Sequence, residues 1–185
     1  MTDPVLNYTV ALVKAPSVRR GDDAVVFKRL MDEGIIIPAL QRGLMCPTTI
    51  RAFYGAHVDK PYFKDLEWSV TGPVVSMLLF KPGEDVVSEW RGLMGPTDPS
   101  KASKETLRGL IGGFAYNGAN AKLADNAVHG SDSYAAAQYE ASLLFPKHVV
   151  WRVEQMLKEI EDADNVITDL EKEGVIEFVD PPTVN

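Results

Sequence analysis

The chain has 185 residues, 45% of them hydrophobic, which is enough for one globular domain with an additional segment. Its formal net charge of −7 argues against nucleic-acid binding, sequence-specific or general, because affinity for a phosphate backbone comes from clustered Lys and Arg. The single cysteine, Cys46, excludes a disulfide framework, and no apolar run approaches the roughly 18 residues that cross a bilayer, so we expect a cytoplasmic protein with no membrane partner.

The first third of the chain predicts two strands around one helix. Residues 8–14 are β-branched and aromatic, which is typical of a buried strand, and residues 15–17 contain a proline that should break it. Apolar positions at helical spacing predict a helix over 22–33. A second strand follows over 35–45, where Pro38 indicates a sheet edge or a bulge.

The middle of the chain predicts a pair of helices, then a strand and another helix. Thr48 should cap a helix that runs to about residue 55, and a second short helix covers 63–70. The strongly apolar run 74–80 predicts a strand that ends at a Pro-Gly turn. A helix over 85–94 comes next.

The last part of the predicted domain is rich in loops. Residues 95–100 lack periodicity, a short helix is expected near 106–110, and the Gly- and Asn-rich residues 112–120 are expected to form a flexible loop. A short strand at 127–128 and a helix over 134–143 close the domain.

This order of elements predicts an α/β (α+β) fold of the ferredoxin-like type, a split βαβ sandwich in which helices cover a four-stranded antiparallel sheet. We place that domain at residues 1–146 and a mostly helical C-terminal extension at 147–185. In the extension we expect two helices, the second ending near Leu170, and a terminal apolar segment at 175–179. The extension should pack on the domain or on a neighbouring subunit.

The segment 126–133 places a histidine among small and polar residues. It lacks the run of bulky apolar residues that is typical of a segment packed in the core. A histidine that acts as a nucleophile needs its far ring nitrogen held by a hydrogen bond, and Glu140 is the candidate partner of His129. The same stretch also suits an ordinary turn, in which Gly130 permits a positive φ and Ser or Asp caps the next helix. Spacing alone leaves both interpretations open.

Further polar residues stand where predicted strands and helices end. They are Lys14, Tyr54, Arg91, Thr97, Arg108, Asn126 and His129. Three cations and a hydroxyl around a histidine suit a phosphoryl group, because guanidinium and ammonium groups stabilise the charge on its oxygens. A histidine acceptor would divide one transfer into two half-reactions through phosphohistidine.

Each of these residues alone also has a structural explanation. Lys14 could be a solvated side chain at a strand end, and Arg91 or Arg108 could pair with surface carboxylates. His57 and His148 lie in no motif, so we assign them to the surface or to packing.

Taken together, the motifs resemble the nucleoside diphosphate kinase family. The pieces that carry the resemblance are Val13-Lys14, Val18-Arg-Arg-Gly21, Tyr54, Lys60-Pro-Tyr-Phe63, Gly72-Pro-Val-Val-Ser-Met77, Arg91-Gly-Leu-Met-Gly-Pro-Thr-Asp-Pro99, Thr106-Leu-Arg-Gly109 and Asn126-Ala-Val-His-Gly-Ser-Asp-Ser133. They cover residues 8–145 in order, so the combination is specific although each piece is modest.

The resemblance implies roles for these residues. His129 would be the phosphorylated nucleophile, oriented by Glu140, with Ser131 near the transferred phosphate. The phosphates would be held by Lys14, Tyr54, Arg91, Thr97 and Arg108. Asn126 and Lys14 would also reach the ribose, Mg²⁺ would bridge the nucleotide's own oxygens with few or no protein ligands, and Tyr62, where the family usually has Phe, would stack on the base beside Leu66.

The chain departs from the family pattern in three places. It has Lys14-Ala-Pro16 where the family usually has Lys-Pro-Asp, and Lys104-Glu105 where the family has Pro-Gly. The spacing from Arg108 to Asn126 is longer by about eight residues, an insertion within 110–125 whose composition favours mobility.

The sequence therefore predicts a nucleoside diphosphate kinase that moves the γ-phosphate of a nucleoside triphosphate to a nucleoside diphosphate by a ping-pong mechanism through phospho-His129. The alternative is a catalytically weak nucleotide-binding or scaffold protein of the same fold, in which the insertion has compromised the site. The resemblance also implies a homo-oligomer, a hexamer or else a tetramer or dimer.

Overall fold

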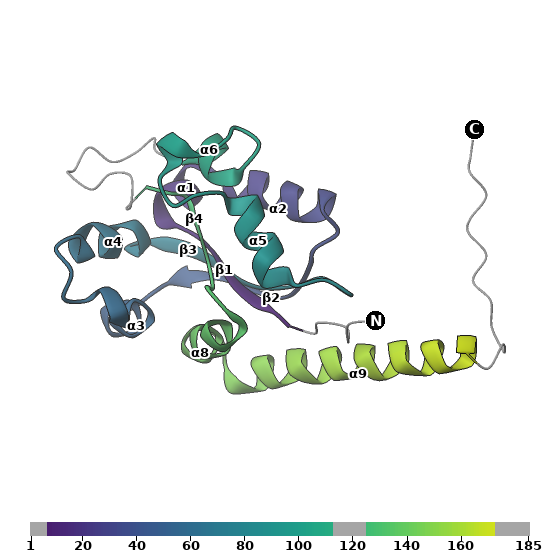
Figure 1. Ribbon diagram of the computed structural model, residues 1–185. Coiled ribbons are helices and arrows are strands. Elements are labelled where there is room, and N and C mark those ends of the chain that lie inside the picture. Colours follow the sequence, from purple (N-terminus) through teal and green to yellow (C-terminus); the bar gives the residue numbers. More distant parts are fainter. Residues whose placement is uncertain (1–6, 113–124, 173–185) are drawn as a thin grey trace.

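A four-stranded antiparallel sheet forms the centre of the computed structural model, which describes residues 7–112 and 125–172 (Figure 1). The strands are β1 (Thr9–Val13), β2 (Ile36–Leu44), β3 (Pro73–Phe80) and β4 (Val128–Gly130). Their order is β2-β3-β1-β4, and every neighbouring pair is antiparallel. The predicted split βαβ sandwich is confirmed.

Helices occupy both faces of this sheet. They are α1 (Ala15–Arg20), α2 (Asp23–Asp32), α3 (Pro47–Phe53), α4 (Phe63–Val70), α5 (Val86–Met94), α6 (Leu107–Ile111), α8 (Tyr134–Leu144) and α9 (Lys147–Lys172), with short 3₁₀ turns η1 (Gly55–His57) and η2 (Pro99–Lys101).

The two faces of β1 supply two separate cores, because successive side chains of a strand point to opposite sides. Val10 and Leu12 pack with apolar residues of α3, α4, α8 and α9. Ala11 and Val13 pack with residues of α2, α5 and α6. Every residue of β1 is buried, so the strand that leads to Lys14 is fixed from both sides.

Two helix starts differ from the prediction, and proline is the reason for both. Residues 15–17 do not simply break the chain after β1; they begin α1, with Lys14 as the N-cap and a proline in the first turn. Helix α3 likewise begins at Pro47 after Cys46, so the prediction that Thr48 caps this helix was wrong. Proline suits a first helical turn, since the amide hydrogen it lacks would be unpaired there.

Strand β2 lies at one edge of the sheet, and the expected irregularity at Pro38 is confirmed by a register shift between Ile36 and Ala39. The two helices predicted for the extension are one continuous helix, α9. Charged and apolar residues continue at helical spacing through the expected break, so nothing in the sequence stops the helix there. The predicted loop 112–120, apart from Gly112, and the segment 175–179 lie outside the described residues.

Candidate active site

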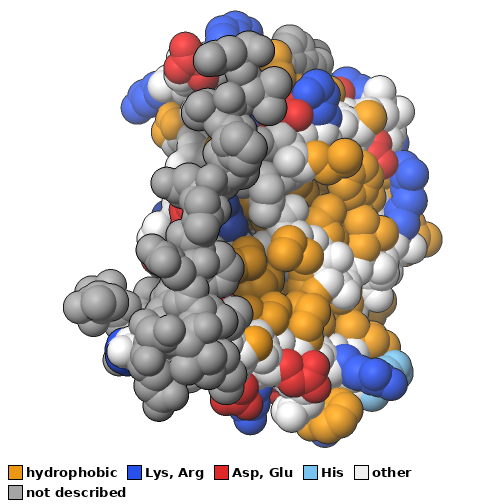
Figure 2. Space-filling view, turned by 90° about the vertical axis from the view of Figure 1, so that its right-hand side faces the viewer, with side chains coloured by type: hydrophobic (Ala, Val, Ile, Leu, Met, Phe, Trp, Pro, Cys, Tyr) orange, Lys and Arg blue, Asp and Glu red, His pale blue; other side chains and the backbone are white. Residues whose placement is uncertain are grey.

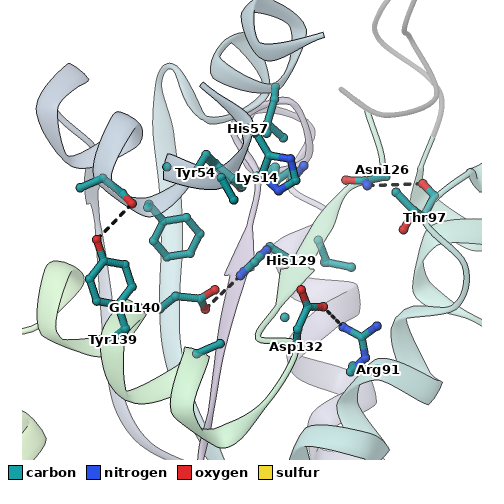
Figure 3. Close-up of a pocket in the computed structure, with 18 of the residues that line it drawn as sticks. Lys14, Tyr54, His57, Arg91, Thr97, Asn126, His129, Asp132, Tyr139 and Glu140 are labelled. Atoms are coloured by element: carbon teal, nitrogen blue, oxygen red, sulfur yellow. Dashed lines mark hydrogen bonds and ion pairs between the residues drawn. The ribbon is translucent and has the colours of Figure 1, made fainter. Parts of the chain in front are cut away.

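A pocket of about 720 Å³ opens where β1, β4 and the ends of α3, α5, α6 and α8 meet (Figure 3). Of the residues selected from the sequence, all but Ser131 line it: Lys14, Tyr54, Tyr62, Leu66, Arg91, Thr97, Arg108, Asn126, His129 and Glu140. The structure thus brings residues from positions 14 to 140 of the chain into one place.

The backbone of His129 is held by strand β1 and by the side chain of Trp90. It sits in the middle of β4, opposite Leu12 of β1, and its carbonyl oxygen accepts a 3.1 Å hydrogen bond from the indole of Trp90. Gly130 must be a glycine, because a Cβ there would lie 2.4 Å from Cδ1 of the Trp90 ring. Just before the strand, Ala127 adopts a φ of 65°, a conformation that non-glycine residues rarely take and that is enriched at active sites.

The imidazole of His129 has one engaged nitrogen and one open nitrogen. Nε2 lies 3.1 Å from Oε2 of Glu140, a buried carboxylate on α8. A carboxylate can only accept, so Nε2 carries the proton and Nδ1 keeps its lone pair. Nδ1 makes no hydrogen bond within the described part of the chain, and the ring faces the pocket (Figure 3).

Ser131 lies behind Glu140 instead of in the pocket. Its fully buried hydroxyl donates to Oε2 of Glu140 at 2.7 Å and accepts from the backbone amide of Val10 at 3.1 Å. The structure therefore gives Ser131 a direct contact with the carboxylate that holds His129. The chain of contacts from β1 through Ser131 and Glu140 fixes the ring orientation of His129.

Lys14 is almost fully buried, and that burial is the main reason its pKa falls to about 7. The positive charge of Arg108 lowers the pKa further, while Asp125 acts in the opposite direction. The backbone amide of Lys14 donates to the carbonyl oxygen of Ala127 at 2.8 Å, so the lysine and the β4 segment are joined directly. A nearby anion would favour the charged ammonium form.

The two arginines of the pocket are held in different ways. Arg108 is buried and donates to the carbonyl oxygens of Gly95 at 2.8 Å and Val128 at 3.0 Å; burial, and then the charge of Arg91, lower its pKa to about 10. Arg91 lies on α5, is half exposed and forms an ion pair with the exposed Asp132. One guanidinium is therefore fixed, and the other is held by a surface partner that a stronger anion can replace.

Several buried polar atoms in the pocket have no protein partner among the described residues. They are the hydroxyl of Tyr54, Oδ1 of Asn126 and Nε of Arg108. The amide nitrogen of Asn126 donates to the carbonyl oxygen of Thr97 at 3.3 Å, which leaves Oδ1 as the acceptor without a partner. Since buried polar groups are nearly always hydrogen-bonded in folded proteins, these atoms have hydrogen-bonding capacity that a bound polar group or water can satisfy.

Aromatic and apolar side chains also line the pocket, and two of the rings lie beside His129. The ring centroid of Phe53 lies 4.9 Å from that of His129, and Tyr54 lies at 6.0 Å. Burial raises the pKa of Tyr54 above its ordinary range, so its hydroxyl stays protonated and can donate. Tyr62, the N-cap residue of α4, and Leu66 on the same helix also line the pocket, and both are half-buried.

Sequence reasoning missed His57, which lines the pocket although we assigned it to the surface or to packing. It is the last residue of η1, and its Nδ1 lies 2.9 Å from the hydroxyl of Tyr62. The available signal was its position three residues after Tyr54, on the turn that follows a predicted site residue. Asp132 was also given no role, yet it pairs with Arg91 at the rim.

Comparisons with known proteins agree with this geometry. The family model described as nucleoside diphosphate kinase matches residues 7–150. The chain is 39% identical over 141 residues to a nucleoside diphosphate kinase of Moorella thermoacetica, covering 76% of this chain and 94% of that protein. It is 34% identical over 143 residues to one from Salinibacter ruber, covering 77% and 94%.

Solved structures give the same result. The nucleoside diphosphate kinase of Aquifex aeolicus superposes with a TM-score of 0.66 at 30% identity, covering 76% of this chain and 96% of that one. The enzyme of Halobacterium salinarum, solved in complex with CDP, gives 0.65 at 29% identity, covering 76% and 88%.

Fold and pocket together define a phosphotransferase with a ferredoxin-like α/β fold. The chain belongs to the nucleoside diphosphate kinase family, as the motifs predicted. Within residues 7–112 and 125–172, no helix combines the length and the apolar composition that a membrane span requires.

Proposed function

We propose that this chain transfers the γ-phosphate of a nucleoside triphosphate to a nucleoside diphosphate in two half-reactions through phospho-His129. The observation that carries the proposal is the ring of His129, whose Nε2 is held by Glu140 while Nδ1 is open to the pocket. In the first half-reaction the Nδ1 lone pair bonds to the γ-phosphorus as its bond to the β–γ bridging oxygen breaks. The nucleoside diphosphate leaves, and a second one reverses the step.

The phosphate chain would be bound by the cationic side of the pocket. Arg108, Arg91 and Lys14 supply positive charge from three elements, and the protonated hydroxyl of Tyr54 supplies a donor without a protein partner. These groups stabilise the charge that spreads over the phosphoryl oxygens during transfer. Thr97 and Asn126 stand together on the same side, where we propose contacts to a phosphate and to the ribose.

We further propose that Mg²⁺ enters with the nucleotide. The described residues contain no group of three or more His, Cys, Asp or Glu side chains that could hold a metal, and Glu140 is already engaged by His129 and Ser131. The exposed carboxylate of Asp132 is the other acid of the pocket and would contact such an ion or its waters. This donor set fits Mg²⁺ carried mainly by phosphate oxygens, where it would offset their negative charge.

The nucleobase would lie against the rings and apolar side chains that include Tyr62 and Leu66. Stacking on an aromatic ring tolerates every base, because each base has a π face. We therefore propose broad acceptance of nucleotides.

A single labelling experiment tests the transfer mechanism. Incubation with γ-labelled ATP should give a label on the protein that is acid-labile and alkali-stable, and that disappears when a nucleoside diphosphate is added. His129→Ala should abolish the label, whereas His148→Ala, a change at an exposed histidine on α9, should leave it intact. An unlabelled wild type, or equal labelling of the His129 variant, would contradict the mechanism.

The alternative, a catalytically weak nucleotide-binding or scaffold protein, is not favoured by any feature of the described pocket. Its basis was the insertion before Asn126, most of which lies in residues 113–124, outside the described part of the chain. The same labelling experiment separates the two, because a weak binder would bind nucleotide without forming a covalent, alkali-stable label on the protein.

We also propose a homo-oligomer and a cytoplasmic setting. Among the described residues, strand β2 pairs only with β3, and its side chains Ile36, Leu40 and Leu44 are 45%, 50% and 77% exposed. Figure 2 shows hydrophobic side chains gathered over the middle of one face. An unpaired edge with exposed apolar residues suits a second copy of the chain. The one cysteine, which is free, suits a reducing compartment.

A further inference from the structure

Two of the side chains that line the pocket, Tyr62 and His57, are joined to each other. The hydroxyl of Tyr62 lies 2.9 Å from Nδ1 of His57, and the two ring centroids are 5.8 Å apart with planes tilted by 53°. Both side chains are half-buried, and both line the pocket. The contact holds for either position of the imidazole proton, since a phenol hydroxyl both donates and accepts.

The hydrogen bond to His57 holds the hydroxyl end of the Tyr62 side chain, while the backbone of Tyr62 is already held at the start of α4. Tyr62 is the N-cap residue of α4, and its carbonyl oxygen accepts from the amides of Asp65 at 3.1 Å and Leu66 at 3.1 Å. His57 is positioned independently, because its own amide donates to the carbonyl oxygen of Tyr54 at 2.8 Å. The ring of Tyr62 is therefore held at its backbone and at its hydroxyl, and a phenylalanine would lack the second attachment.

Two consequences follow for a ligand that places an aromatic face on this ring. Its binding costs less conformational entropy, because the side chain is ordered before the ligand arrives. In addition, the Tyr62 hydroxyl already has a partner in His57, so part of its hydrogen-bonding capacity is used before a base arrives. The face of the ring stays available to any base.

We propose that His57 is a positioning residue that holds Tyr62 ready to stack on the nucleobase, and that the pair compensates for the tyrosine in a position where the family usually has Phe. The inference rests on the proposed function only for the identity of the ligand, a nucleoside di- or triphosphate. His57 acts through Tyr62 and touches no reacting atom.

Equilibrium binding tests the proposal without requiring turnover. ADP should bind about 2- to 10-fold more weakly to Tyr62→Phe and to His57→Ala than to the wild type, the range expected for loss of one hydrogen bond and of a preordered side chain. Ribose 5-diphosphate, which lacks the base, should bind all three proteins equally. The double variant should be no weaker than either single variant, because both changes remove the same contact.

Kinetics and a conservative variant separate positioning from a merely structural role. In phosphotransfer the two single variants should raise KM for the nucleoside diphosphate and leave kcat within about 2-fold. His57→Asn, which keeps a polar atom near the place of Nδ1, should restore part of the ADP affinity. Tyr134→Phe on α8 and His148→Ala on α9 are matched controls outside the pocket, and melting temperatures report the folding of every variant.

The outcomes distinguish this proposal from the proposed function. Equal weakening of ADP and ribose 5-diphosphate, or additive effects in the double variant, would overturn the positioning role. Unchanged ADP affinity in both single variants would also overturn the positioning role of His57, even if the enzyme is fully active. A wild type that binds ADP but forms no phosphohistidine would contradict the transfer mechanism, while the comparison of ADP with ribose 5-diphosphate would still decide the role of His57.

Discussion

The side chain of Lys14 is buried beside the positive charge of Arg108. Arg108 acts on it directly, and Arg91 acts on Arg108 in turn. Burial and this field together put the pKa of Lys14 at about 7, so the residue exchanges its proton near neutral pH in the free protein. Bound phosphates would raise the pKa of Lys14 again, because a nearby negative charge favours the ammonium form.

At the scale of this residue we predict proton uptake on nucleotide binding. With a pKa of about 7, roughly 0.9 of Lys14 side chains are neutral at pH 8, and phosphate contact should return them to the charged form. Calorimetry in two buffers of different ionisation enthalpy should show uptake approaching one proton per ADP at pH 8 and much less at pH 6. Affinity should weaken as pH rises above 7.

Lys14→Arg is the matched control for that prediction. An arginine stays charged throughout this pH range, so its variant should bind ADP with no comparable uptake at pH 8. Equal uptake by the two proteins would mean that the proton comes from a different group.

Much of the site could be predicted from residue types at the ends of elements. His129, Arg91 and Asn126 stand in motifs whose order along the chain is informative, and the fold gathers them. The contacts of Ser131 and His57 could not be predicted, because each depends on which way a turn directs a side chain. Ser131 is turned inward to Glu140 by the pairing of β4 with β1, which no local pattern encodes.

At the scale of elements, α9 adds to the core beyond the part that matches the family. The family match ends at residue 150, in the first part of this helix, yet Val153 and Leu157 are buried in the core that includes Val10 and Leu12 of β1. The predicted boundary at residue 146, between the kinase-like domain and the C-terminal extension, therefore stays a prediction. Physically, the helix and the domain share one apolar cluster on that face of the sheet.

Leu157→Ala should therefore destabilise the whole domain. Removing a large buried side chain costs about 2–5 kcal/mol through lost burial and the cavity that remains. Urea unfolding of the wild type and the variant measures the difference. The neighbouring exposed residue gives the control: Lys158→Ala should change the free energy of unfolding by less than about 0.5 kcal/mol. Similar small effects for both would show that α9 is not part of the folded core.

Element types were more predictable than their ends. Alternating and helical apolar spacing located the long elements, since burial dictates that spacing. The short helix α1 and the start of α3 were missed because a proline suits both the end of one element and the first turn of the next, and local sequence does not decide between them.

For the whole molecule, the exposed edge of the sheet at β2 is the contact through which we propose that copies of the chain assemble. Pro38 and Arg42 on β2 protect this edge in part, since proline lacks a donor and charge opposes pairing. The exposed apolar side chains of the same strand instead favour association with a second copy of the chain. We therefore propose that copies of the chain assemble through the β2 edge.

Leu40→Lys should shift the protein to a species of lower mass. A charge placed on the apolar edge strand would be costly to bury against a second copy. Light scattering at fixed concentration gives the mass. Ser142→Lys, an exposed position on α8, adds the same charge elsewhere and should leave the mass unchanged. If Leu40→Lys also keeps the wild-type mass, this edge is not the contact.

The pairing of β4 with β1 connects folding with activity. Lys14 directly follows β1 and His129 lies in β4, and the hydrogen bonds of these two strands set the register between them. A slip of one residue would turn the imidazole to the opposite face of the sheet, away from Glu140. Because more than a hundred residues separate the two strands in sequence, this pairing has a high entropic cost and depends on the rest of the sheet. Partly folded chains without the β1–β4 ladder therefore have no assembled nucleophile, and recovery of transferase activity during refolding reports the completion of the sheet.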